Sequence, residues 1–172
     1  LKVYDKDLKE TETYTGAESI TLADYYLDFI YSVEGNKIIK YTKGDATEKL
    51  STTDWGTAND FEGAKDLTVA YSIWLITKDN KVVKYTGGDK DAFTLQADHS
   101  PENPVAITTS IDFDNLYIAD KATGKVLVFD KEGAFSKEYA NDKWSDIKSI
   151  TVTQDEKTLY ILSGSRVYKI SL

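Results

Sequence analysis

The chain has 172 residues and a net charge of −8, with 29 Asp and Glu against 21 Lys and Arg. This length suits one domain, and the negative charge argues against a nucleic-acid backbone or an anionic membrane surface as the partner. The chain has no Cys and one His. This composition excludes disulfide scaffolds, thiolate chemistry and metal sites that need two histidines, and it predicts no cofactor.

The sequence begins at Leu1 and contains no Met, so we expect a mature or excised segment. We find no stretch of the roughly 18 apolar residues that a membrane span needs, and no signal-peptide order at the start, so we expect no direct membrane insertion. The composition is compatible with the cytoplasm and with bacterial export. The acidic, Thr- and Tyr-rich character favours an extracytoplasmic bacterial domain.

A short pattern recurs from the first residues onward. Residues 36–42 (NKIIKYT) and 80–86 (NKVVKYT) match at five of seven positions, and further copies lie at 1–5, 124–130 and 165–171. The aromatic anchor of each copy, or its equivalent, stands at positions 4, 41, 85, 129 and 170, so the spacings are 37, 44, 44 and 41. A nearly constant period of this size is typical of β-propeller blades.

Each repeat carries the same elements in the same order. A β-branched run is followed by a more apolar run, an Asn- or Gly-containing turn, the anchored run and a polar run, which is the pattern of two hairpins with a solvent-facing outer strand. We predict first strands at 19–22, 66–69, 105–108 and 149–152, second strands at 29–33, 73–77, 116–119 and 159–162, and outer strands at 10–15, 46–52, 92–97 and 135–140.

The predicted fold is therefore all-β, a β-propeller of four-stranded antiparallel blades of about 41–44 residues. Complete blades are expected at 19–52, 66–97 and 105–140, with the end of a blade at 1–15 and an incomplete last blade at 149–172. A β-sandwich or a solenoid of hairpins is the alternative, but it fits the nearly constant period and the four-strand grading less well.

The ends of the chain allow two kinds of ring. Residues 10–15 could supply the missing outer strand to 149–171 and close a ring of four blades. Alternatively, the chain is the C-terminal part of a ring of six to eight blades, which we favour because Leu1 starts inside a strand. An incomplete ring would expose strand edges and is expected to self-associate.

Residues 115–133 (NLYIADKATGKVLVFDKEG) resemble the NHL-type propeller repeat, in which an (L/I)YVAD strand, a polar turn, a basic residue and a VxVFD strand precede a Gly-containing turn. The other repeats keep the spacing but lack the Ala-Asp pair. The resemblance implies a platform that binds protein, RNA or ligand, with lactonase-like enzymes as a minority. The negative charge makes RNA a poor fit. Asp120 of this motif is expected to be a structural acceptor.

Catalytic and metal-binding motifs are sparse. His99 stands between Asp98 and Ser100, but immediate neighbours on a loop do not converge as a catalytic triad must, so we expect a solvated loop. Acidic clusters occur at 5–7, 87–91 and 112–115. The cluster at 112–115 has carboxylates at alternate positions, as calcium loops do, but lacks the Gly and terminal acid of such a loop. Asp, Asn and Gly are also favoured in tight turns, so turn formation is the main interpretation and calcium binding the alternative.

The aromatic residues divide into two groups. Tyr41, Tyr85 and Phe129 recur at equivalent positions and are expected to pack between blades. Trp55 and Trp144 lie in less regular segments, where an exposed ring could anchor a partner, with packing over a blade edge as the default.

The sequence thus predicts a noncatalytic binding or scaffold module that recognises a protein or glycan through loops on one ring face. A metal-dependent, lactonase-like hydrolase is the first alternative. It would need acidic or amide side chains from several blades around one cation. A structural spacer within a larger surface protein is the second alternative.

Overall fold

The computed structural model describes residues 2–4, 7–13, 19–42 and 50–172 and confirms the all-β propeller architecture. Three antiparallel sheets have four strands each. The first blade consists of β3 (Leu22–Tyr26), β4 (Phe29–Glu34), β5 (Lys37–Thr42) and β6 (Ser51–Thr57), and the second of β7 (Asp66–Val69), β8 (Ile73–Ile76), β9 (Val82–Thr86) and β10 (Asp89–Lys90). The third blade consists of β11 (Pro104–Thr108), β12 (Asn115–Asp120), β13 (Lys125–Asp130) and β14 (Phe135–Ala140).

Partial sheets flank these three blades. A fourth blade has three strands, β15 (Ile147–Val152), β16 (Thr158–Ser163) and β17 (Arg166–Ser171). At the other end, β1 (Lys2–Tyr4) pairs with β2 (Glu10–Thr13). The only helical elements in the described part of the chain are the three-residue 3-10 turns η1 (Asn59–Phe61), η2 (Ala97–His99) and η3 (Asp142–Trp144).

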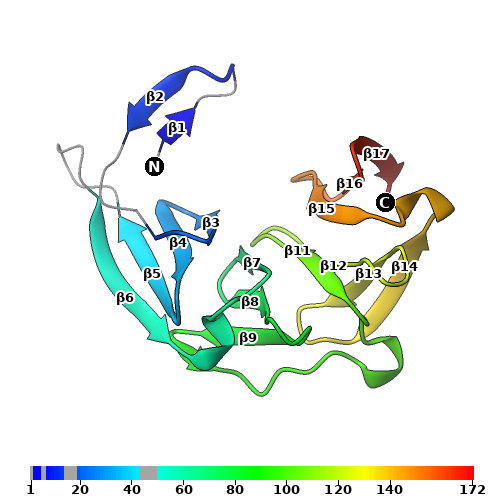
Figure 1. Ribbon diagram of the computed structural model, residues 1–172, viewed down its shortest axis with the longest axis horizontal. Helices are drawn as coiled ribbons and strands as arrows, with labels where there is room; N and C mark the ends of the chain where they lie inside the picture. The colour runs from blue at the N-terminus through cyan, green and yellow to red at the C-terminus, as the bar shows by residue number, and fades with distance from the viewer. Residues whose placement is uncertain (1, 5–6, 14–18, 43–49) are drawn as a thin grey trace.

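The blades follow one another around an arc, with their first strands innermost (Figure 1). β3 lies against β7, β7 against β11, and β11 against β15. The arc is open in this view, between the β1–β2 pair and the fourth blade (Figure 1). β2 pairs with β1, not with β17, so the described residues do not form the four-bladed closure in which residues 10–15 complete the last sheet.

The first blade is shifted toward the C-terminus relative to the prediction. Its first strand runs over Leu22–Tyr26, where 19–22 was expected, and its outer strand over Ser51–Thr57, where 46–52 was expected. Residues 46–49 lie outside the described residues. The pairing with β4 explains the first shift, because Leu22 to Tyr26 are the residues that lie opposite Val33 to Phe29.

The outer strand of the second blade is the largest departure from the prediction. Only Asp89–Lys90 pairs with β9, and residues 92–97 form no strand. They turn instead to the third blade, where the Gln96 N–H bonds to the Gly133 carbonyl at 2.9 Å. Gly133 has φ +97°, and a Cβ there would stand 2.2 Å from the Thr94 carbonyl oxygen, so the close approach requires glycine.

The core lies between successive blades. One cluster joins the first and second blades through residues such as Ile38 and Leu75, the next joins the second and third, and another joins the third and fourth. Tyr41, Tyr85 and Phe129 are all at most 3% exposed, so the prediction that the recurring anchors are core residues is confirmed.

Candidate interaction surface

The turns that join the first and second strands of the blades, here called the inner turns, expose large hydrophobic side chains. Of six such side chains exposed among the described residues, four belong to inner turns or lie next to them. They are Tyr25 (61% exposed), Leu27 (58%), Tyr71 (76%) and Ile111 (50%). We call this set the apolar turn surface.

Hydrogen bonds between blades place the inner turns side by side on one face of the arc. Asp24, next to the first inner turn, accepts a hydrogen bond from the Val69 N–H at 2.7 Å, next to the second. The Thr68 hydroxyl donates to the Thr109 carbonyl at 3.2 Å and accepts from the Thr109 N–H at 3.1 Å, which links the second turn to the third. Tyr25, Leu27, Tyr71 and Ile111 therefore follow one another along that face.

Glu156 fixes the third inner turn from the fourth. Its carboxylate accepts hydrogen bonds from the Asp114 N–H at 3.1 Å, the Asn115 amide at 2.8 Å and the Tyr117 hydroxyl at 2.9 Å. Burial, followed by the hydrogen bond to Glu156, raises the pKa of Tyr117. Glu156 has φ 54°, an unusual conformation for a side chain of this kind. This contact network was not foreseen, because nothing in the repeat pattern marks Glu156.

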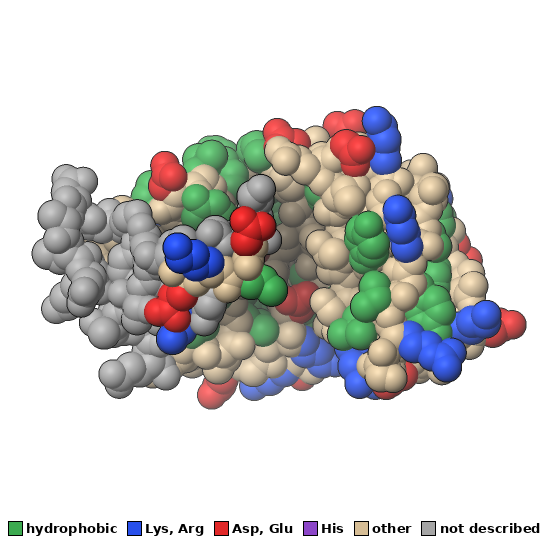
Figure 2. Space-filling view, turned by 90° about the horizontal axis from the view of Figure 1, so that it is seen from above, with side chains coloured by type: hydrophobic (Ala, Val, Ile, Leu, Met, Phe, Trp, Pro, Cys, Tyr) green, Lys and Arg blue, Asp and Glu red, His purple; other side chains and the backbone are tan. Residues whose placement is uncertain are grey.

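Acidic side chains surround the apolar turn surface. Those exposed in the inner turns are Asp28, Asp112, Asp114 and Asp155, against the single basic Lys157. Lys131, from the neighbouring β13–β14 turn, donates to the Ser110 carbonyl at 2.9 Å. Figure 2 shows hydrophobic and acidic side chains along most of the upper margin of the view, with Lys or Arg at its right end, and more Lys and Arg, mixed with acidic side chains, along the lower margin. The inner turns thus combine apolar contact area with negative charge.

Two half-buried carboxyl groups lie on the inner strands. Burial raises the pKa of Asp24, and burial with the charge of Asp24 raises the pKa of Asp66 to about 6. Asp66 accepts hydrogen bonds from the Ile107 N–H at 2.8 Å and the Leu67 N–H at 3.0 Å. Like Asp24, it links its strand to that of the next blade, so both carboxyl groups have a structural role that accounts for their position.

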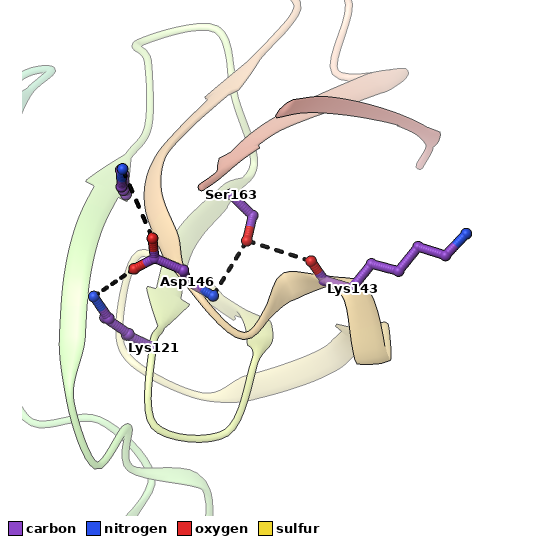
Figure 3. Close-up of polar contacts among 5 residues, drawn as sticks. Lys121, Lys143, Asp146 and Ser163 are labelled. Atoms are coloured by element: carbon purple, nitrogen blue, oxygen red, sulfur yellow. Dashed lines mark hydrogen bonds and ion pairs between the residues drawn. The ribbon is translucent and has the colours of Figure 1, made fainter. Parts of the chain in front are cut away.

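The opposite face of the arc is organised by ion pairs (Figure 3). Asp146 lies between two lysines, with Lys121 Nζ at 2.6 Å and Lys148 Nζ at 3.7 Å, and its N–H donates to the Ser163 hydroxyl at 3.2 Å. The hydrogen bond from Lys121 lowers the pKa of Asp146. The Ser163 hydroxyl also donates to the Lys143 carbonyl at 3.4 Å. Asp146, Lys121 and Lys148 are thus paired with one another, whereas the Lys143 side chain extends away from them.

Asp120 lies beneath this face and is 1% exposed. Its carboxylate accepts hydrogen bonds from the Asn103 N–H and the Thr123 hydroxyl at 2.8 Å, and from the Glu102 and Ala122 N–H groups at 3.2 Å. The expectation that Asp120 is a structural acceptor is confirmed.

The two tryptophans named from the sequence do not share a surface. Trp144 is 2% exposed in the cluster between the third and fourth blades, and its indole N–H has no hydrogen-bond partner in the described part of the structure. Trp55 is half-buried on β6 and meets Tyr31 edge-on, with ring centroids 6.1 Å apart. The packing interpretation describes Trp144, whose ring is not available to a partner in this structure.

His99 ends η2 and stacks on Phe135, with ring centroids 3.6 Å apart and the planes within 4°. The loop therefore packs on the third blade. No group of three or more potential metal ligands occurs within residues 2–4, 7–13, 19–42 and 50–172. Calcium binding stays an open alternative, and Asp5 of the first acidic cluster lies outside the described residues.

A groove of about 990 Å³ opens beside β9, where residues 91–97 leave the second blade. Val82, Val83, Phe93 and Leu95 contribute to its walls, with Lys81 and Gln96 among the polar groups. Glu132 is the one acidic residue among those lining it, so the groove offers no set of converging acids. No helix in the described residues has the length and apolarity needed to cross a membrane.

Comparisons with known proteins support the architecture. No protein-family model matches the chain, and no curated protein matches its sequence. Solved structures match over nearly the whole chain. Virginiamycin B lyase from Staphylococcus aureus is 16% identical over 98% of this chain, with a TM-score of 0.59. Nidogen, in its complex with laminin, is 13% identical over 99% of this chain, with a TM-score of 0.75.

A protein from Bacteroides uniformis provisionally named a 6-phosphogluconolactonase is 16% identical over 96% of this chain, with a TM-score of 0.63. The chain spans 61% of the lyase, 59% of the lactonase-like protein and 69% of nidogen. These similar structures have mixed functions, so they do not establish whether the chain is an enzyme. At such low identity they show the fold alone, which is a β-propeller.

Proposed function

We propose that the chain is a noncatalytic β-propeller module that binds a protein partner through the apolar turn surface. The observation that carries this proposal is the position of Tyr25, Leu27, Tyr71 and Ile111 on three successive inner turns of one face. Hydrophobic side chains that are scattered singly need no explanation, whereas a series on adjacent turns offers a continuous contact area.

The charge around this surface specifies the chemistry of the partner. Asp28, Asp112 and Asp114 are exposed in the same turns. Acidic groups at the rim of an apolar patch favour partners that bring basic side chains, and they act mainly on specificity and association rate. We therefore propose a partner segment with aromatic or aliphatic side chains next to Lys or Arg.

A lactonase-like hydrolase is the second candidate, supported by the fold similarity to the Bacteroides uniformis protein and by the raised pKa of Asp66. Because perturbed carboxyl groups occur both at catalytic sites and in structural networks, the pKa alone does not assign a role. Asp24 and Asp66 each accept two backbone hydrogen bonds, which favours the structural role.

The proposal can be tested by selecting binders from a random peptide display library with the whole chain as bait. Peptides that combine aromatic or aliphatic residues with Lys or Arg should be enriched. They should be lost with a Tyr71→Ser/Ile111→Ser bait and retained with an Asp146→Ala bait, which changes the opposite face. Enrichment that is unchanged by Tyr71→Ser/Ile111→Ser, or no enrichment at all, would contradict the proposal.

The same preparation separates the enzyme from the binding module. Thermal unfolding with and without calcium and a hydrolysis assay on simple lactones should show neither a calcium-dependent stabilisation nor turnover. A calcium-dependent rise in the unfolding midpoint together with lactone hydrolysis would instead favour the hydrolase.

A further inference from the structure

The second blade has an incomplete outer edge in the middle of the chain. β6 has seven residues and β14 has six, whereas β10 has two. The groove of about 990 Å³ lies where β10 stops, and Val82 and Val83 of β9 line it. β9 lies on the outer side of the arc, away from both ends of the chain (Figure 1). The missing part of this outer strand is therefore a feature of the second blade itself.

The hydrogen bonds of β9 show which of its backbone groups face the groove. The Lys81 carbonyl accepts a hydrogen bond from the Thr77 N–H at 2.8 Å, so Lys81 faces the β8 side. The Lys84 carbonyl accepts from the Asp91 N–H at 2.9 Å, so Lys84 faces outward. Because this direction alternates along an antiparallel strand, the N–H and C=O of Val82 also face outward. Within the described residues no backbone hydrogen bond from the segment 91–97 reaches Val82.

Val82 is also less covered than its counterparts in the first and third blades. In the recurring pattern it corresponds to Ile38 and Val126. Ile38 lies opposite Gly56 of β6, Val126 lies opposite Tyr139 of β14, and both are 0% exposed. Val82 lies beyond the end of β10 and is only half-buried. An added strand would thus cover a position that the other two blades bury.

The outer strands of the first and third blades supply an acidic partner to the lysine at the start of the same pattern. Lys37 pairs with Asp54 of β6 at 2.8 Å, and Lys125 pairs with Glu138 of β14 at 2.8 Å. In both blades the acid lies opposite the residue two positions after the lysine. The charge and the register of the outer strand are therefore coupled at this point.

Lys81 holds this position in the second blade, and none of the ion pairs among the described residues includes it. β10 stops opposite Tyr85, so it places no residue opposite Val83, where the acid would stand. Asp60 lies near Lys81, but its carboxylate already accepts hydrogen bonds from the Tyr85 hydroxyl at 2.7 Å and from Lys90. The groove thus presents a positive charge where the other blades hold an acidic side chain.

We propose that this groove binds an extended segment of a protein partner, which adds to β9 beside Val82 and places an acidic residue opposite Val83. Hydrogen bonds to the N–H and C=O of Val82 align the segment, as in other cases of strand addition. The ion pair with Lys81 sets its register. The free stretch is short because β10 and Asp91 occupy the edge from Lys84 onward, so side-chain contacts in the groove must add to the affinity.

The first and third blades also indicate which residue follows the acid. Asp54 is followed by Trp55 and Glu138 by Tyr139, and both rings pack against the hydrophobic cluster beside their blade. Phe93 lines the groove and packs against the cluster between the second and third blades. The expected partner segment therefore has an acidic residue followed directly by an aromatic one. This charge is opposite to that of the partner proposed for the apolar turn surface, so the two sites are independent.

The test uses the whole chain and a fluorescent peptide of residues 135–140, which is the sequence of β14 with Glu138. Anisotropy should show saturable binding, and hydrogen exchange followed by NMR should slow at the Val82 amide. Glu138→Lys in the peptide should weaken binding about two- to fivefold, as for an exposed ion pair. The Lys81→Glu protein should reverse this preference. Lys78→Glu, in the neighbouring β8–β9 turn, is the charge-matched control and should keep the preference of the unaltered chain.

Val82→Pro removes the outward N–H at an edge position, so the unfolding midpoint should be retained while peptide binding is lost. Tyr71→Ser should bind the peptide as the unaltered chain does, because the apolar turn surface is not involved. Unchanged exchange at Val82 on peptide addition would overturn the proposal, as would a peptide preference unaltered by Lys81→Glu.

Three further results would also overturn it. Exchange that changes along β13 instead of β9 would show that the peptide replaces β14. Protection of the Val82 amide in the free protein at all concentrations would show that the chain itself covers the edge. Protection that grows with protein concentration would show that a second copy does so.

Discussion

The two faces of the arc have similar hydrogen-bonding supports but different surface side chains. Each has a carboxylate that accepts several hydrogen bonds, Glu156 within the inner turns and Asp120 beneath the opposite face. At the surface, the inner turns present Tyr71 at 76% exposure, whereas the opposite face presents Asp146 paired with Lys121. Glu156 and Asp120 hold the backbone in place, and the exposed side chains are what distinguish the two faces.

This difference indicates where function is to be sought. An exposed ion pair is already satisfied within the chain and adds little to stability. An exposed aromatic ring gains free energy when a partner removes it from water. The comparison can be tested by substituting the hydrogen-bonding carboxylates and the exposed residues in separate variants.

The largest effect is expected for Asp120→Ala. The substitution leaves the Asn103 N–H and its neighbours without their acceptor beneath the surface, so the free energy of unfolding should fall by about 3–4 kcal/mol. Ser163→Ala, at the corresponding end of β16, is the matched control and should cost about 1 kcal/mol. Equal losses in urea unfolding would show that the buried carboxylate is not the main support.

Glu156→Ala should lower the free energy of unfolding by about 2–3 kcal/mol, because the Tyr117 hydroxyl and the Asn115 amide lose their acceptor. Gln154→Ala removes a neighbouring contact at 3.4 Å between exposed groups and should leave stability nearly unchanged. Glu156→Gly also relieves the positive φ. The alanine variant, which keeps the positive φ, is therefore the measure of the network, and a Glu156→Ala protein as stable as the unaltered chain would show that the carboxylate contributes nothing.

Asp66 is expected to make stability depend on pH. Its pKa rises from 3.8 in the unfolded chain to about 6 in the folded chain, so its contribution is complete below about pH 4 and is lost as the pH rises through 6. Between pH 4 and pH 7 the unaltered chain should lose about 2 kcal/mol relative to Asp66→Asn. A difference that stays constant, or moves in the opposite direction, would contradict the raised pKa.

The smallest effect is expected for Asp146→Ala on the opposite face. The Lys121 and Lys148 pairs are solvent-exposed, so the unfolding midpoint should stay within experimental error of the unaltered chain at moderate salt. A clear loss of stability that persists at high salt would show instead that these ion pairs stabilise the fold.

The regular part of the fold could be predicted from the sequence because it repeats. Tyr41, Tyr85 and Phe129 recur with the blade period and are all buried, and Tyr85 and Phe129 lie in clusters that join neighbouring blades. Asp120 could be recognised from its place at the end of a strand in the repeat, where free N–H groups need an acceptor.

The candidate surface could not be predicted in this way. Tyr71 and Ile111 are single residues in turns, where no periodicity separates an exposed side chain from a buried one. Trp144 shows the converse, since it lies in an irregular segment that η3 folds into the core. The end of β10 depends on Gly133 of another blade, a contact that no local pattern signals.

The most direct test is the affinity of one selected basic and aromatic peptide for three proteins, the unaltered chain, Tyr71→Ser and Asp146→Ala. The account predicts that Tyr71→Ser weakens binding about tenfold or more, with an unchanged unfolding midpoint, because the ring is exposed and contributes to contact rather than to the core. Asp146→Ala should bind as the unaltered chain does. Equal affinity for Tyr71→Ser and the unaltered chain would contradict the assignment of the inner turns as the recognition surface.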